Sequence, residues 1–179
     1  MNINKNTFLI DKFYSRQIKI PEIGETGQIK IMSSALLVNT YDTISKDVIF
    51  LCASIGFRTI FLRDPDDYRE NLKIRNPFLN VEKIEDLDFA KFERLYIIGN
   101  NKRTSFFSNK GVFHVNFKKD DTTTVVSFSK YFEFWKYDTK NTVDKRMLAC
   151  ILTSEIVKHI VDDEFEKVVE IEFPEVFLQ

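Results

Sequence analysis

Two short apolar runs flank an amphipathic segment in the first third of the chain, and this arrangement limits the possible folds more than any other feature. The runs cover residues 35–38 and 59–62, each long enough for a buried strand and too short for a helix. Between them, apolar residues recur with the period of a helix. These residues are Ile44, Val48, Leu51, Cys52 and Ile55. Gly56 follows as a predicted C-terminal cap, so the segment predicts a parallel strand–helix–strand unit.

The rest of the sequence continues this alternation. Further strands are predicted at residues 81–84, 95–98, 111–117, 122–128 and 168–173. Helices are predicted at residues 6–13, 24–32 and 143–160. A polar turn at 118–121 joins two of the strands, and the aromatic segment 131–137 fits neither pattern clearly. We expect an α/β fold with a mostly parallel central sheet, flanking helices and an antiparallel extension, in a single domain over residues 1–179.

Composition argues against several classes of function. The net charge of -1 and the pI near 6.2 create no field that attracts nucleic acid or anionic lipid. No apolar stretch reaches the roughly 18 residues of a membrane span, and the N-terminus lacks the apolar run of a signal peptide, so we expect an intracellular protein. Cys52 and Cys150 are too few for a four-ligand zinc site, and we expect both to be small core residues.

The segment before the first strand carries a specific motif. Tyr14, Arg16 and Gln17 form a Tyr-x-Arg-Gln element, and residues 21–28 follow as a Pro-Glu-x-Gly-x-x-Gly-Gln element. In this order and spacing, the two elements resemble the opening of the ubiquitin-like activating enzyme family. That family includes the ThiF-like bacterial adenylating enzymes of molybdopterin and thiamine synthesis. The resemblance implies a Rossmann-like adenylation domain.

The similarity extends along most of the chain. Asp64 follows the second strand, where the family has an Asp that holds the ATP ribose. Asn76 and Pro77, followed by Val81, are similar to the family's Asn-Pro-x-x-x-Val entry to the third strand. The strand 95–98 and the helix 148–160 resemble the family's next strand and the helix after its crossover loop.

The chain departs from the family at the nucleotide site. Where the family has a Gly-x-Gly-x-x-Gly loop, this sequence runs from Asn39 to Ile44 without a glycine. Glycines in such a loop allow a tight turn and let the backbone approach phosphate. Here Tyr41 adds a ring and Asp42 a negative charge, so we expect no ATP in the usual pose. Asn100 stands near the position of the family's magnesium-binding Asp, and no Cys-x-x-Cys zinc motif occurs.

Arg16 matches a functional residue of the family's N-terminal motif. In the family, the arginine of this motif reaches the ATP bound by the partner subunit, so the resemblance implies a catalytic role for Arg16 in trans. The chain is similar to the smaller, non-catalytic partner in the SUMO- and NEDD8-activating enzymes. We therefore expect a regulatory subunit that binds no cofactor or metal itself. A catalytic partner would carry ATP and magnesium and act on a ubiquitin-like protein.

The same residues allow other interpretations. The chain could be a divergent adenylyltransferase that binds nucleotide in an altered pose through Arg63, Lys73 or Arg75, or a scaffold that only binds other proteins. Arg16 could be an ordinary surface arginine, and Asp64 a turn or cap residue instead of a ribose ligand. The aromatic segment 131–137 is better explained by core or interface packing than by stacking on nucleic acid. We expect His114 to be a strand residue.

Overall fold

The computed structural model describes residues 12–99, 111–119, 123–129, 133, 135–137, 142–162 and 168–172. The strands are β1 (Ser34–Val38), β2 (Thr59–Leu62), β3 (Asn80–Lys83), β4 (Arg94–Ile98), β5 (Val112–Lys119), β6 (Thr123–Ser129), β7 (Trp135–Tyr137) and β8 (Val168–Glu172). The helices are α2 (Ser15–Ile18), α3 (Gly24–Ser33), α4 (Thr43–Ile55), α5 (Asp66–Arg75) and α6 (Thr142–Val161), with short 3-10 turns η1 (Ile84–Asp86) and η2 (Phe89–Lys91).

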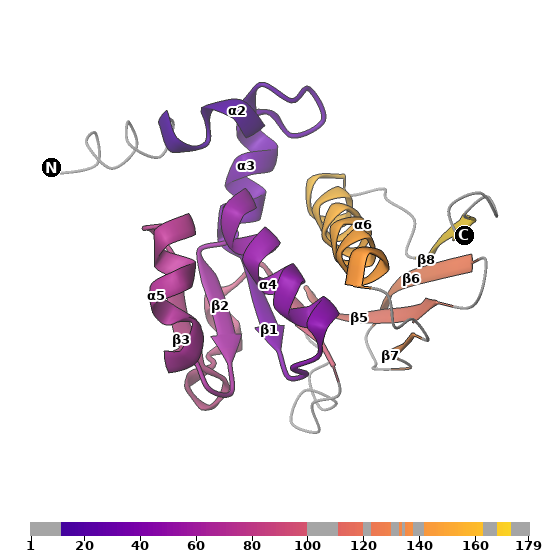
Figure 1. Ribbon diagram of the computed structural model, residues 1–179. Helices are drawn as coiled ribbons and strands as arrows, with labels where there is room; N and C mark the ends of the chain where they lie inside the picture. Colours follow the sequence, from indigo (N-terminus) through magenta and orange to yellow (C-terminus); the bar gives the residue numbers. More distant parts are fainter. Residues whose placement is uncertain are drawn as a thin grey trace, which may run out of the picture.

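The described strands form one mixed sheet in the order β3-β2-β1-β4-β5-β6-β8 (Figure 1). Strands β1 to β5 pair in parallel, whereas β6 is antiparallel to both β5 and β8. The short strand β7 pairs in parallel with β5, beyond the part of β5 that β4 covers. This arrangement confirms the predicted fold class: a mostly parallel sheet with an antiparallel extension. The prediction of a single domain over residues 1–179 stays a prediction.

The main core lies between one face of the sheet and the helices α4 and α6, which pack against each other. Its buried residues from the strands include Leu36, Val38, Tyr96, Ile98, Val115, Phe117, Val126 and Phe128. The predicted apolar period of α4 matches its burial at Ile44, Val48 and Cys52. On the other face, a smaller cluster contains Leu37, Phe61, Leu95 and Ile97. Burial on both faces explains why the parallel strands consist of continuous apolar runs.

The carboxyl end of α4 is held by side-chain amides from three separate segments. Gln17 and Gln28 donate to the carbonyl oxygens of Ser54 (3.4 Å) and Ile55 (3.0 Å). The Asn76 amide is fully buried and donates to the carbonyls of Ala53 and Phe57, at 3.0 Å each. The last carbonyls of a helix have no partner within the helix, and burying them unpaired would be costly. Three residues of the family-like motifs therefore act as a cap for α4.

The carboxyl end of α6 is held in a similar way. Arg94 donates to the carbonyl of His159 at 2.7 Å, and Lys30 donates to that of Val161 at 3.2 Å. Two cationic side chains at the end of a helix also complement the negative end of its dipole. His159 itself is buried, with its Nδ1 atom 2.8 Å from the hydroxyl of Tyr96. These bonds connect α6 to α3 and to the centre of the sheet.

Several elements differ from the sequence-based expectations. Helix α5 was not predicted, because its only buried residue is Leu72 and no apolar period marks it. The aromatic segment contributes the short strand β7. The prediction that Cys150 lies in the core is wrong: it is exposed on α6, whereas Cys52 is buried. The strand predicted at 81–84 begins and ends one residue earlier, because Ile84 starts η1.

Two further expectations concern the ends and the surroundings of the chain. The helix predicted at 6–13 falls largely outside the described residues, which begin at Lys12. In the described part of the chain, no helix is both long enough and apolar enough to cross a membrane.

Gly56 tests the importance of the α4 cap. Its φ of +115° is unfavourable for other residues, and an added Cβ would overlap the amide nitrogen of Gln28. Gly56→Ala is expected to lower the free energy of unfolding by about 2–5 kcal/mol, from backbone strain and the displaced hydrogen bond. Gly24→Ala is the control, because Gly24 also has a positive φ (+56°) but faces open space. Gly24→Ala should lower the free energy of unfolding, measured by urea unfolding, by only about 1–2 kcal/mol. Equal losses in the two variants would contradict the assigned role of Gln28.

Candidate functional site

The strand order reverses between β1 and β4, since β2 lies on one side of β1 and β4 on the other. In open parallel sheets, ligands bind outside the carboxyl ends of the strands at this switch point. Here the chain leaves β1 through residues 39–42, which we call the switch-point loop. The backbone N–H of Asn39 donates to the carbonyl of Ile98 at the end of β4, at 2.9 Å. The loop therefore lies directly over the position where a nucleotide would be expected.

Tyr41 links this loop to the end of β2. Its hydroxyl oxygen accepts hydrogen bonds from the backbone N–H groups of Arg63 and Asp64, the latter at 3.2 Å. Its ring lies 6.2 Å from that of Tyr68 on α5. Consecutive backbone N–H groups that point at one oxygen are a typical binding site for polar ligands. In this protein, the side chain of Tyr41 takes that position itself.

Asp42 occupies the amino end of α4. Its Oδ1 atom accepts the backbone N–H of Ser45 at 2.8 Å, while its Oδ2 atom accepts the Thr40 hydroxyl at 3.3 Å. The Ser45 hydroxyl closes the turn by donating to the Thr40 carbonyl at 2.9 Å. The amino end of this helix is where a Rossmann-like fold normally binds phosphate. Here a carboxylate of the chain already bonds to it, and further negative charge would be repelled.

Two more residues complete the surroundings of the loop. An added Cβ at Gly99 would come within 3.0 Å of Thr40, so the end of β4 approaches the loop closely. Tyr137 comes from β7, and burial together with the nearby Asp42 carboxylate raises the pKa of its hydroxyl. Sequence reasoning missed Tyr137 because its position depends on the pairing of β7 with distant β5.

Asn100, the expected replacement of a magnesium ligand, lies outside the described residues.

The predicted site residues Arg16 and Asp64 do not meet. Asp64 is exposed at the end of β2, beside the switch-point loop. Arg16 is exposed on α2, whose Gln17 contacts the opposite end of α4. A helix of 13 residues such as α4 is about 20 Å long. Figure 1 shows the same separation, with α2 beyond one end of α4 and the β1–α4 loop at the other.

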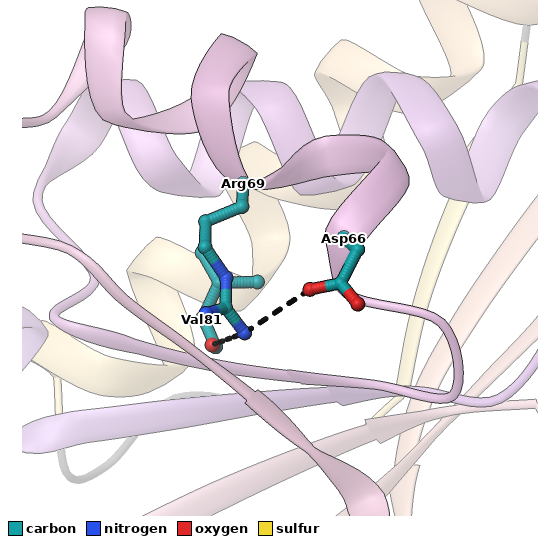
Figure 2. Close-up of polar contacts among 3 residues, drawn as sticks. All are labelled: Asp66, Arg69 and Val81. Atoms are coloured by element: carbon teal, nitrogen blue, oxygen red, sulfur yellow. Dashed lines mark hydrogen bonds and ion pairs between the residues drawn. The ribbon is translucent and has the colours of Figure 1, made fainter.

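The basic residues considered for an altered nucleotide pose are also dispersed. Arg63 donates to the Asn39 side chain at 2.9 Å, and the guanidinium of Arg75 lies 5.1 Å from the ring centre of Phe50. Lys73 lines an open groove of about 200 Å³ between α5 and β3. The residues of this α5–β3 groove are Arg69, Lys73, Leu79, Asn80, Val81 and Glu82. Figure 2 shows Arg69 beside Asp66 and the carbonyl of Val81.

Comparison with solved structures defines the fold further. The chain superimposes on PaaA with a TM-score of 0.65 at 14% sequence identity, over 92% of this chain and 71% of that chain. The E. coli MccB structure with ATP matches with a TM-score of 0.53 at 11% identity, over 82% of this chain and 65% of that chain. MccB with MccA matches with a TM-score of 0.55 at 10% identity, over 82% of this chain and 62% of that chain.

The fold is that of the ThiF/E1-like adenylation domains. Identities this low establish the fold alone. The chain also spans less than two thirds of both of these MccB chains. No protein-family model and no curated protein sequence matches the chain.

Among the described residues, His114 is the most deeply buried titratable side chain on the sheet face opposite α6. It is 1% exposed on β5, and neither ring nitrogen has a hydrogen-bond partner among the described residues. Its place in a strand agrees with the sequence-based expectation. Burial lowers the pKa of the imidazole from its usual 6.5, because the charged ring loses hydration.

This burial predicts a pH dependence of stability. As the pH falls below about 6.5, the unfolded chain binds a proton at position 114 before the folded chain does. Stability is therefore complete above that pH and decreases as the pH falls towards the lowered pKa of the folded state. His114→Leu should flatten the profile of unfolding free energy between about pH 6.5 and 5. A variant with the slope of the wild-type protein would show that His114 is protonated equally in both states.

Proposed function

We propose that this chain is a non-catalytic subunit of a heterodimeric activating enzyme that adenylates a ubiquitin-like protein. A catalytic partner would bind ATP and magnesium, and this chain would complete the partner's site through Arg16. The proposal rests on the adenylation-type fold, on the resemblance of the N-terminal motif and on the separation of Arg16 from the chain's own switch point.

The observation that carries the proposal is the occupation of the switch point by the chain's own side chains. Tyr41 bonds to the backbone amides at the end of β2, and Asp42 bonds to the amino end of α4. The fold itself is compatible with nucleotide, as the ATP complex of MccB illustrates. The side chains of the loop, rather than the architecture, therefore argue against a nucleotide in this subunit.

The position of Arg16 supports action on another chain. Because α4 separates Arg16 from Asp42 by about 20 Å, an arginine side chain cannot span the distance to its own switch point. Arg16 is exposed, and its guanidinium forms no hydrogen bond or ion pair with another described residue. A permanently charged fork at the surface can bind phosphate oxygens of a nucleotide held by a partner.

The chemical contribution of Arg16 would be electrostatic. In adenylation, a carboxylate oxygen of the substrate attacks the α-phosphorus of ATP, an acyl-adenylate forms and pyrophosphate leaves. Negative charge accumulates on the bridging and terminal phosphate oxygens as that bond breaks. A guanidinium placed beside these oxygens stabilises the charge without exchanging a proton.

Arg16→Ala should slow adenylation by the reconstituted pair by roughly 10- to 150-fold, the equivalent of a charge-assisted hydrogen bond. Assembly of the pair should persist, because the exposed side chain adds little to the packing of α2. Pyrophosphate release gives the rate, and size-exclusion chromatography follows assembly. Lys19→Ala is the matched control, since Lys19 is an exposed cation just after α2 and should leave the rate unchanged.

An unchanged rate in Arg16→Ala would favour the scaffold interpretation, in which the fold serves only to bind other proteins. Isolation of the chain as a stable monomer, with no catalytic relative bound or encoded, would overturn the proposal as a whole.

The second candidate function is a divergent adenylyltransferase with an altered nucleotide pose. The α5–β3 groove favours it, because Arg69 and Lys73 are cations that line an open space. Calorimetric titration of the isolated chain with ATP and magnesium separates the two functions. We expect no measurable heat of binding up to millimolar nucleotide. Binding that is lost in Lys73→Ala would favour the adenylyltransferase.

A further inference from the structure

The outer edge of β3 carries backbone hydrogen-bonding groups that pair with no other described strand. β3 ends the sheet order, and among the described strands it pairs only with β2. An edge strand presents backbone N–H and C=O groups that can pair with another extended chain. The register of β3 shows which residues present them.

Alternate residues of β3 point their backbone groups in opposite directions. The N–H of Asn80 donates to the carbonyl of Arg58 at 2.8 Å, so Asn80 faces β2, and Glu82 does the same two residues later. Val81 and Lys83 therefore direct their N–H and C=O groups outward. The Arg69 guanidinium confirms the direction, because it donates to the Val81 carbonyl at 3.3 Å from the outer side (Figure 2).

Charged side chains lie on both faces of the sheet along this edge. Val81 is buried in the core between the sheet and the helices, so Lys83, two residues on, points to that same face of the sheet. Arg69 and Lys73 of α5 lie on this face as well, on the α5–β3 groove. The helix side of the edge therefore carries three cations, Arg69, Lys73 and Lys83, and the carboxylate of Asp66 beside Arg69. Asn80 and Glu82 also line the groove, but the alternation along β3 turns their side chains towards the other face of the sheet.

The hydrogen bond from the Arg69 guanidinium to the Val81 carbonyl can be replaced by bonds to a partner. The same guanidinium pairs with Asp66 at 3.5 Å, and the two side chains are 46% and 82% exposed. Exposed ion pairs of this kind contribute little to stability. Arg69 can thus turn towards an incoming carboxylate, and the Val81 carbonyl then accepts a backbone N–H.

We propose that the outer edge of β3 binds an extended, acidic segment of a protein partner by strand addition. Backbone hydrogen bonds to Val81 and Lys83 would provide the pairing. Successive side chains of a strand point to opposite faces, so acidic residues at every second position of the segment would meet Arg69, Lys73 and Lys83. This interaction surface is separate from Arg16 and does not depend on the role proposed for it.

The test uses the full chain, labelled with ¹⁵N, and a synthetic peptide of alternating Glu and Thr. Addition of the peptide should shift the amide resonances of Val81 and Lys83 in a saturable manner. A peptide of alternating Lys and Thr is the charge control and should leave them unchanged. In the variant Arg69→Glu/Lys73→Glu, the preference should invert, so that the Lys peptide binds at least about tenfold more tightly than the Glu peptide.

Lys83 separates backbone pairing from simple charge attraction. Its φ of -78° suits proline, and its N–H points away from β2, so Lys83→Pro removes one outward donor without disturbing the sheet. Lys83→Ala removes only the charge and should weaken binding by up to about fivefold. Lys83→Pro should weaken it by about a further tenfold, with an unchanged circular dichroism spectrum.

Two results would overturn the proposal. If the Glu peptide does not bind at millimolar concentration, Arg69 and Lys83 act only to protect the edge against unwanted pairing. If it binds equally well to Lys83→Pro and Lys83→Ala, the groove attracts acidic chains by charge alone, without an added strand.

Discussion

The rest of the structure depends on the hydrogen bonds that the backbone carbonyl groups at the carboxyl end of α4 accept. The amides of Gln17, Gln28 and Asn76 come from segments that lie before β1 and after α5, yet they converge on the carbonyls of residues 53–57. Each bond satisfies a group that would otherwise be costly to bury. Together they hold the N-terminal helices and the entry to β3 in place against the central helix. The motif that resembles an enzyme signature thus has a direct role in the fold.

The two ends of α4 account for the functional interpretation. At the carboxyl end, the cap places α2 and Arg16 about 20 Å from the switch point. At the amino end, Asp42 and Tyr41 bond to the backbone groups that could otherwise bind a nucleotide. A chain built in this way has an adenylation fold with its own ligand position taken by side chains. It also carries the exposed Arg16 at the opposite end of α4 from that position.

The sequence allowed prediction of the elements that have an apolar period or run. β1, β2 and α4 lie where the pattern of residues 35–62 placed them, because burial on the sheet determines which residues are apolar. α5 was not predicted because Leu72 is its only buried residue and no apolar period marks the helix. The place of Tyr137 beside Asp42 was equally unpredictable, since it depends on pairing between β7 and β5. Cys150 was assigned to the core because a helical period alone does not define the exact limits of the buried face.

By itself, the sequence determined the strand–helix alternation, the absence of glycine from the loop after β1 and the N-terminal motif around Arg16. These are local properties, fixed by which residues follow one another along the chain. Only the tertiary structure decided that Tyr41 bonds to the end of β2 and that Arg16 lies at the far end of α4. It also decided that the backbone groups of Val81 and Lys83 face outward, close to Arg69 and Lys73. Each of these depends on contacts between segments distant in sequence, and such contacts arise from the register of the strands and the packing of the helices on the sheet.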